Sequence, residues 1–310
     1  MKPRRTFLRQ AGCLAVAALA AGCRPASSGS SAKPRTLKLG YTPAEESVAD
    51  REQAARTLAQ YLERELGQAV ELVRTASYGP AVDALARGEI DVIGLGPFAY
   101  VLAAARGAAE VLVVTGDAVG APRQYQSLLV THRRTGVRSL GELPADAGRL
   151  RLDFTDPASN SGHLVPLARL RAEGLEPARD FRGVEFTLSH SVSVFNVLFD
   201  RTDVAGVSAS VVGRLRAKGR LPDDELVVLW ASDRLPSGPI AVHPGLEASV
   251  KANLRRALLA LPERDPAAAR AVMAQYQEAN LRFVAAEDTL YDGLRQLATQ
   301  LEPERIIPGR

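Results

Sequence analysis

The amino-acid sequence predicts an α/β protein made of two lobes with a ligand cleft between them. The first observation is that short apolar strands alternate with helical stretches from residue 36 onward, which favours sheets covered by helices on both faces. The second is that this alternation starts again after Gly136. The third is the length of 310 residues, because a domain takes up about 150 residues. Ligands of open α/β sheets tend to bind in such a cleft.

The first unit is predicted from its hydrophobic spacing, in which alternation indicates strands and a period near four indicates helices. The expected strands are 37–41, 70–73, 90–95, 111–115 and 127–131, and the expected helices are 52–66, 79–87 and 98–105. Gly67 follows the first helix as a C-terminal stop. Since helices link successive strands, we expect a largely parallel sheet.

The second unit repeats the pattern, and the chain then returns to the first. The expected strands are 149–154, 184–188 and 204–207, and the expected helices are 161–173, 191–199 and 210–218. Strands 226–230 and 239–242 lead back, and the C-terminal third is read as helices 246–261, 267–283 and 286–301. We therefore expect one lobe from 37–127 and 228–310 and another from 128–227, joined by a two-strand hinge near 127–131 and 226–232.

The N-terminus has the features of an export signal. Basic residues between Lys2 and Arg9 precede an apolar run that leads into Cys23, so residues 1–22 are predicted to be a signal peptide. Ala20-Ala21-Gly22-Cys23 resembles a bacterial lipobox, which predicts lipidation of Cys23. Arg4-Arg5 resembles a twin-arginine signal, and a general secretion signal fits as well. Residues 23–36 are small and polar, which indicates a lipid-anchored flexible tether.

Composition excludes several classes of function. The net charge is +4, from 39 Lys and Arg against 35 Asp and Glu; removing the four basic residues of 1–22 leaves 35 of each. Such a chain has no general electrostatic attraction for nucleic acid. Scattered histidines and the single cysteine left after cleavage predict no metal site. No apolar run approaches the ~18 residues that span a bilayer.

Several segments together resemble a known family. In chain order they are Gly40-Tyr41-Thr42-Pro43, Ser77-Tyr78, Gly96 to Ala103, Tyr125-Gln126-Ser127, Asp156 to Gly162, Leu188-Ser189-His190-Ser191, Leu235 to Pro239 and Tyr291 to Arg295. The chain resembles the phosphate-, phosphite- and phosphonate-binding proteins of ABC importers, the PhnD-like family. The resemblance covers residues 37–305.

The resemblance implies a type II periplasmic-binding-protein fold, which closes around an oxyanion and delivers it to a membrane permease. It implies a small oxyanion ligand, an ABC permease and ATPase as partners, and a monomer held to the membrane by its lipid anchor. The expected location is the periplasm or cell envelope, at either the inner or the outer membrane. No cofactor, no metal and no catalytic residue are expected.

The segment from Asp156 to Gly162 is the first candidate for holding an oxyanion. It follows a predicted strand and opens a helix, so backbone N–H groups and the positive end of the helix dipole point outward there. Ser159, Asn160 and Ser161 add neutral donors, and Gly162 permits close backbone approach. The same residues also suit a plain helix cap. In the family the middle position is usually Thr, which Asn160 replaces.

Other candidate ligand residues come from the resemblance. Tyr78, Tyr125 and His190 match family ligand positions, and Ser208 lies in the stretch that corresponds to the family's amine-binding residues. Tyr41, Pro97 and Phe98 are expected to line the pocket. A structural histidine and ordinary packing of the tyrosines are the alternative interpretations.

The ligand is expected to be compact and without a cationic group. Family members that bind aminoalkylphosphonates use acidic residues in the second lobe, whereas residues 206–210 here contain no carboxylate. Phosphate, phosphite and methylphosphonate therefore fit. The alternatives are a lipoprotein that binds another small anion or an organic ligand, or one that serves a membrane kinase as a sensor, since a fold does not determine function. A hydrolase is disfavoured, because the sequence has no Gly-x-Ser-x-Gly elbow.

Overall fold

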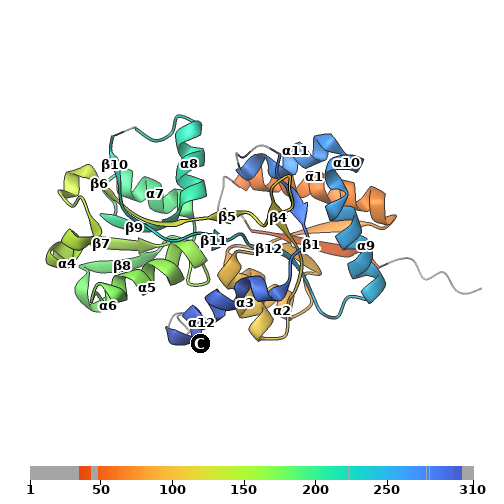
Figure 1. Ribbon diagram of the computed structural model, residues 1–310, viewed down its shortest axis with the longest axis horizontal. Coiled ribbons are helices and arrows are strands. Elements are labelled where there is room, and N and C mark those ends of the chain that lie inside the picture. The colour runs from red at the N-terminus through yellow and green to blue at the C-terminus, as the bar shows by residue number, and fades with distance from the viewer. Residues whose placement is uncertain (1–34, 43–47, 223, 277, 279, 302–310) are drawn as a thin grey trace, which may run out of the picture. The chain divides into compact units, whose positions relative to one another are not determined.

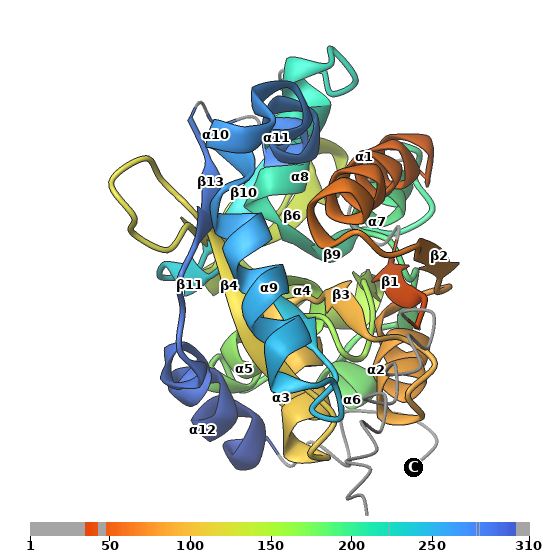
Figure 2. The same ribbon diagram turned by 90° about the vertical axis from the view of Figure 1, so that its right-hand side faces the viewer.

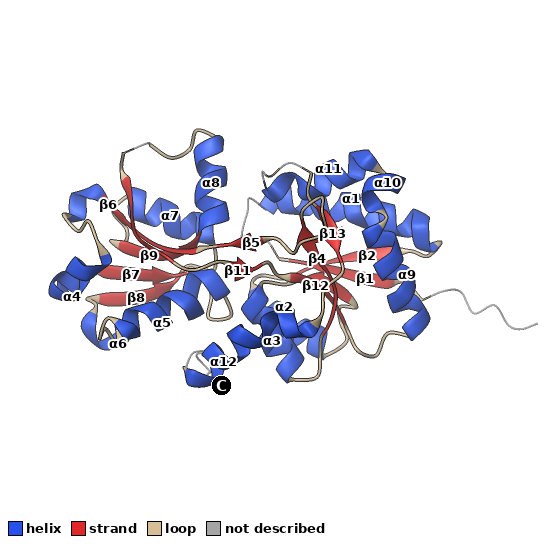
Figure 3. Ribbon diagram, viewed as in Figure 1, coloured by secondary structure: helices blue, strands red, loops and turns tan. Residues whose placement is uncertain are grey.

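The computed structural model describes residues 35–42, 48–222, 224–276, 278 and 280–301. The predicted signal peptide, Cys23 and nearly all of the predicted tether lie outside these residues. The described part contains two large sheets, each covered by helices (Figure 1; Figure 3). The expectation of two α/β lobes is therefore confirmed, and we call them the first and the second lobe.

The first lobe is built on a six-stranded sheet. Its strands are β1 (Leu37–Tyr41), β2 (Val70–Arg74), β3 (Val92–Gly94), β4 (Glu110–Gly116), β12 (Pro239–Val242) and β13 (Arg282–Val284). Their order is β13-β4-β12-β3-β1-β2. Its helices are α1 (Val48–Leu66), α2 (Tyr78–Ala86), α3 (Pro97–Ala105), α9 (Ala248–Leu259), α10 (Leu261–Arg264), α11 (Pro266–Met273) and α12 (Asp292–Gln300). Helix α9 packs against β4 and α1 (Figure 2).

The second lobe is built on a five-stranded sheet. Its strands are β6 (Ser127–His132), β7 (Arg151–Phe154), β8 (Gly183–Phe186), β9 (Val204–Ser208) and β10 (Leu226–Ala231), in the order β10-β6-β9-β7-β8. Its helices are α4 (Leu143–Asp146), α5 (Val165–Ala172), α6 (Pro177–Asp180), α7 (His190–Leu198) and α8 (Ala209–Ala217). A π-helical turn over Asn160–Leu164 leads directly into α5.

The chain passes between the lobes at a short antiparallel ribbon. Strand β5 (Gln124–Tyr125) pairs with β11 (Leu235–Pro236) between the two sheets (Figure 1). The crossings expected near 127–131 and 226–232 are thus displaced, because those residues form β6 and β10, which pair with each other inside the second sheet. The lobe boundaries at 127/128 and 227/228 stay a prediction.

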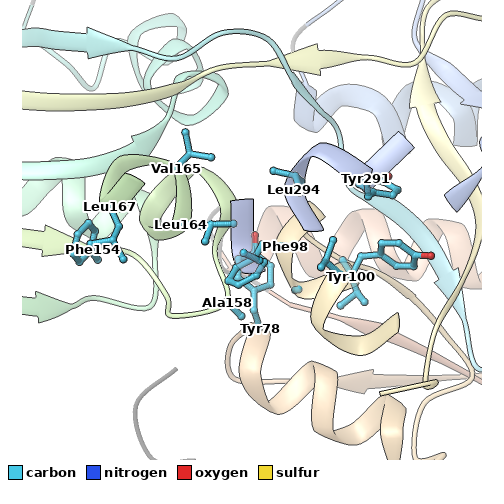
Figure 4. Packing of buried hydrophobic residues seen from close by; sticks show 14 of the residues in the cluster. Tyr78, Phe98, Tyr100, Phe154, Ala158, Leu164, Val165, Leu167, Tyr291 and Leu294 are labelled. Carbon is cyan, nitrogen blue, oxygen red and sulfur yellow. The ribbon is translucent and has the colours of Figure 1, made fainter. Parts of the chain in front are cut away.

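Three clusters of buried apolar side chains hold the layers together. Alternate strand residues face opposite sides of a sheet, so Val92 of β3 packs with α1, α9 and α11, while its neighbour Ile93 packs with α2 and α3. The cluster that contains Ile93 continues into the second lobe, and Figure 4 shows Tyr78 and Phe98 beside Ala158 and Leu164. The lobes therefore share one continuous apolar contact.

Two expectations about the elements are wrong. Both sheets are mixed rather than largely parallel: β1 pairs in parallel with β2 and β3, but β12 and β13 pair antiparallel with β4. The helix expected over 267–283 ends at Met273, and Arg282–Val284 form β13. This strand is three residues long, which is too short for a period of two to be visible in the sequence.

Candidate functional site

A cavity lies between the two lobes. Residues of both lobes and of the crossing ribbon line it, and its empty volume is about 1030 Å³, part of which is open to solvent. Of the residues predicted to bind or line, five lie in its wall: Tyr41, Tyr78, Pro97, Tyr125 and Ser208. The structure thus brings these five residues together around one space, and the ligand or lining role of each stays a prediction.

The first lobe contributes two helix starts to the cavity. Tyr78 begins α2 and Pro97 begins α3, so both helices present N-terminal backbone to the same space. Gly96 allows this close approach, because a Cβ there would lie 3.3 Å from Cζ of Tyr78. Tyr41 lies at the end of β1, and burial raises the pKa of its phenol. Phe98 is fully buried in the core and does not line the cavity.

The crossing ribbon contributes Tyr125, and the second lobe contributes Ser208. Tyr125 leaves the crossing ribbon just before β6, and its hydroxyl accepts a hydrogen bond from Nδ2 of Asn160 at 3.2 Å. Ser208 ends β9 and precedes α8, and its backbone N–H donates to Nδ1 of His190 at 3.1 Å. Each of these residues therefore joins the cavity wall to a predicted ligand residue that lies behind it.

The helix-opening segment lies buried behind the wall. Ser159 caps the helix, since its Oγ accepts from the backbone N–H of Gly162 at 3.0 Å, and the carbonyl of Ser161 accepts from Oγ of Ser127 at 2.8 Å. Ser159, Asn160 and Ser161 are each 2% exposed, and none is in the wall. The alternative role as a helix cap is thus realised for Ser159, and the ligand role stays a prediction.

Asn160 has an unusual position within this segment. Its Nδ2 bonds to Tyr125, but its Oδ1 is buried and has no hydrogen-bond partner among the described residues. A buried polar atom without a partner costs free energy, so native proteins rarely keep one. The two ends of an amide are nearly indistinguishable in shape. An anion beside Asn160 would favour the orientation in which Oδ1 accepts from Tyr125 and Nδ2 donates to the anion.

His190 begins α7 and is held by the second lobe. Nδ1 accepts from the backbone N–H of Ser208 and lies 3.1 Å from Oγ1 of Thr155. With Nδ1 used as an acceptor, a neutral ring carries its hydrogen on Nε2. Nε2 lies 3.5 Å from Oγ of Ser159, at the long limit for a hydrogen bond. The ligand role of His190 stays a prediction.

Asp156 connects the lobes directly. Its carboxylate is 1% exposed and accepts from the backbone N–H of Tyr78 at 3.1 Å and from that of Ala158 at 2.7 Å. Burial raises the pKa of Asp156, and these hydrogen bonds and one from the Ser77 side chain oppose the rise. The bond to Tyr78 holds the start of α2 against the helix-opening segment of the second lobe.

His163 has a structural position. It is 3% exposed, hydrogen-bonds through Nδ1 to the carbonyl of Pro157 at 3.0 Å, and packs edge-on against the rings of Phe154 and Phe186. Burial lowers the pKa of His163 to about 4. Within the described ranges, no group of three or more His, Cys, Asp or Glu residues is arranged to hold a metal ion.

Two arginines in the wall were missed by the sequence reasoning. Arg51 of α1 and Arg123, just before β5, both line the cavity. Neither belongs to a motif, and an isolated arginine carries no signal by itself. The one available clue for Arg123 was its spacing of two residues from Tyr125, which places both side chains on the same face of an extended segment.

No helix in the described part of the chain is both long and apolar enough to cross a membrane.

Comparison with known proteins identifies the family. Residues 39–291 match the family model of the periplasmic substrate-binding protein of phosphonate ABC transporters. The chain is 30% identical over 244 residues to the phosphate-import protein PhnD of Mycolicibacterium smegmatis, covering 74% of each protein. It is 26% identical over 192 residues to the phosphonates-binding periplasmic protein of Escherichia coli, covering 62% of this chain and 56% of that protein.

Solved structures show the same two-lobed fold. A binding protein component of an ABC phosphonate transporter from Pseudomonas aeruginosa superposes with a TM-score of 0.75 at 24% identity, covering 87% of each chain. PhnD1 from Prochlorococcus marinus, solved with methylphosphonate, superposes with a TM-score of 0.76 at 18% identity, covering 87% of this chain and 100% of that one. Together with the family match, these observations show that the chain belongs to the periplasmic substrate-binding proteins of phosphonate ABC transporters.

Proposed function

We propose that the protein is the extracytoplasmic binding lipoprotein of an ABC importer and that it binds a small phosphorus oxyanion in the cavity between its lobes. The observation that carries the proposal is the cavity itself, which collects donors from both lobes around one space. Tyr78, Tyr125 and Ser208 of its wall supply hydroxyl groups. Phosphate, phosphite and phosphonates are the ligand class, in accordance with the family.

The second lobe adds donors behind the wall. The buried amide of Asn160 is hydrogen-bonded to Tyr125, and Nδ1 of His190 is hydrogen-bonded to Ser208, so we assign Nε2 of the same ring to the anion. Donors that are fixed before the ligand arrives replace the water that the anion loses, and each charge-assisted hydrogen bond contributes about 1.5–3 kcal/mol. A set of oriented neutral donors can therefore hold an oxyanion in a buried site.

Titration calorimetry on the full chain tests this function. At least one of phosphate, phosphite and methylphosphonate should bind, and sulfate should bind more weakly. Tyr125→Phe removes one hydroxyl from the wall and should weaken binding by about tenfold, since ~1.4 kcal/mol is a factor of ten. Tyr61→Phe is the matched control, because its hydroxyl donates to the carbonyl of Ala257 outside the cavity. Absence of binding by every phosphorus oxyanion would contradict the proposal.

We further propose that residues 1–22 direct export and that cleavage leaves a lipid-modified Cys23 at the start of the tether 23–36. The lipobox-like sequence supports this step. In this arrangement a monomer reorients above the membrane and meets its permease and ATPase there. Mass spectrometry of membrane-extracted protein should find a lipidated N-terminal cysteine, and Cys23→Ser should release the protein from the membrane fraction. An unmodified chain in the membrane extract would refute lipidation.

A further inference from the structure

The described wall of the cavity carries positive charge. Arg51 and Arg123 line it, and no Asp, Glu or Lys stands among the described residues of that wall. Nη2 of Arg51 comes within 3.7 Å of the position that a Cβ would take at Gly94. The guanidinium of Arg51 thus lies near the carboxyl end of β3. The guanidinium of Arg123 attracts a negatively charged ligand group and repels an ammonium group.

Arg123 is held in place by both lobes. The residue is 9% exposed, and its Nη2 donates to Oγ of Ser210 in the second lobe at 3.0 Å. In the first lobe, its guanidinium carbon lies 5.0 Å from the centre of the Tyr276 ring. Its backbone N–H donates to the carbonyl of Thr115, and its carbonyl accepts from the N–H of Ser237. A guanidinium fixed in this way is preorganised for a planar carboxylate.

The carboxylate that pairs with Arg123 in the structure is the more exposed partner. Nε of Arg123 donates to Oε1 of Glu278 at 2.8 Å, and the two side chains are 7% and 49% exposed. Water already solvates about half of Glu278, so this carboxylate loses little by turning away. A carboxylate carried by the ligand can therefore take its place on the buried guanidinium.

The cavity has an apolar side besides its hydroxyls and arginines. Ala54, Ala55 and Leu58 of α1, Val272 of α11 and Phe283 of β13 form an apolar side of the wall. These side chains suit methylene groups between two polar ends of a ligand.

We propose that the ligand is a phosphonate whose short carbon chain ends in a carboxylate. The phosphonate group lies among the hydroxyls of Tyr78, Tyr125 and Ser208, and the carboxylate lies on Arg123. Arg123 and Tyr125 are two residues apart in an extended segment, about 7 Å along the chain, so we expect a short spacer between the two ends of the ligand. This assignment rests on the proposed function, because it names the substituent of the phosphorus compound bound in the same cavity.

Calorimetry with methylphosphonate, 2-aminoethylphosphonate, phosphonoacetate and 3-phosphonopropionate tests the assignment on the full chain. One of the two phosphonocarboxylates should bind at least tenfold more tightly than 2-aminoethylphosphonate. Arg123→Gln should abolish that preference and leave methylphosphonate affinity within about threefold, since it removes a contact to the substituent alone. Glu278→Gln should strengthen phosphonocarboxylate binding several-fold, because it removes the competing carboxylate.

Arg256→Gln is the matched control, since it removes an exposed arginine that lies outside the cavity wall. It should leave all four affinities unchanged. Equal or tighter binding of 2-aminoethylphosphonate would overturn the assignment, as would an equal loss for all four compounds in Arg123→Gln. If methylphosphonate, phosphate and phosphite also fail to bind the unaltered chain, the proposed function itself has failed, which is a distinct result.

Discussion

At the scale of single residues, the two nitrogens of His190 have different tasks. Nδ1 accepts from the N–H of Ser208, which is a contact within the protein, whereas Nε2 is the nitrogen that we propose donates to the ligand. An asparagine can imitate Nδ1 and a glutamine can imitate Nε2, because their amide groups reach about as far as the respective ring nitrogen. These two substitutions therefore separate the two tasks.

We expect His190→Asn to keep the bond to Ser208 and to weaken oxyanion binding by about tenfold or more, the value of one charge-assisted hydrogen bond. His190→Gln should retain more of the affinity and lose thermal stability instead. Calorimetry and thermal unfolding of both variants measure the two effects. The reverse order, in which His190→Asn binds the oxyanion normally and His190→Gln binds it weakly, would show that His190 acts only within the protein.

His163 should make stability depend on pH. Its pKa is lowered from 6.5 to about 4 in the folded state, so below about pH 6.5 the unfolded chain takes up a proton that the folded chain does not. The contribution of His163 to the free energy of unfolding is therefore fully present above pH 6.5. It is lost as the pH falls towards 4, by about 3 kcal/mol in total.

Urea unfolding at several pH values measures this loss. His163→Phe keeps a ring against Phe154 and Phe186 and should flatten the profile between pH 4 and 6.5, although the lost bond to Pro157 lowers stability at pH 7. His243→Asn is the control, since its side-chain oxygen can still accept from the N–H of Gly245. A profile with the same slope in His163→Phe would assign the pH dependence to other groups.

The cavity residues differ in how far the sequence could predict them. Tyr78 and Pro97 lie at helix starts, and a helix start has a sequence pattern that can be read. Arg123 was missed because its place in the wall depends on contacts with Ser210 and Tyr276, which are far from it in the chain. Such a placement is a property of the tertiary structure and leaves no local signal.

At the scale of elements, the helix formed by Asn160–Leu164 and α5 depends on Gly162. A Cβ at this position would lie 2.3 Å from Oγ1 of Thr155 and 2.9 Å from Cε1 of His190. Gly162→Ala should therefore push the helix away from β7 and His190. We expect a loss of about 1–3 kcal/mol in unfolding free energy, as for other overpacked sites, together with weaker oxyanion binding.

Gly213→Ala provides the comparison within α8. Nothing lies within 4 Å of a Cβ at Gly213, so alanine should stabilise this helix by about 0.5–1 kcal/mol. Urea unfolding of both variants measures the difference. Equal stability of the two variants would mean that the helix at Gly162 can shift without cost.

Elements with several turns or a long apolar run were predictable, whereas short ones were not. Strand β9 is buried along its whole length between helices, and its apolar residues indicated it clearly. Strands β5 and β11 have two residues each, and no periodicity exists over two residues. Their positions follow from the pairing between distant segments, which local sequence does not record.

At the scale of the whole molecule, two lobes with a ligand space between them were predictable from the restart of the α/β pattern. The strand order and the mixture of parallel and antiparallel pairing in the sheets could not be predicted. Local sequence indicates which residues form strands, but the neighbours of each strand are decided by packing among all of them. The place of β12 between β3 and β4 is the clearest case.

That place of β12 determines the order in which the chain can fold. Strands β3 and β4 each have one unpaired edge until β12 inserts between them, and Val92 pairs with Val242, which lies about half of the chain further on. The second sheet needs only residues 127–231, since all its strands come from that interval. Contacts between distant residues form slowly, because the loop between them must close first. The second lobe should thus finish folding before β12 completes the sheet of the first lobe.

The single tryptophan, Trp230, lies in β10 of the second lobe. Its fluorescence should reach the native value earlier than the amide protons of β12 become protected from exchange. If both signals arrive together, the lobes fold as one unit. A lag instead leaves the strand edges of β3 and β4 exposed to other chains, and newly exported protein would be most prone to aggregate during that interval.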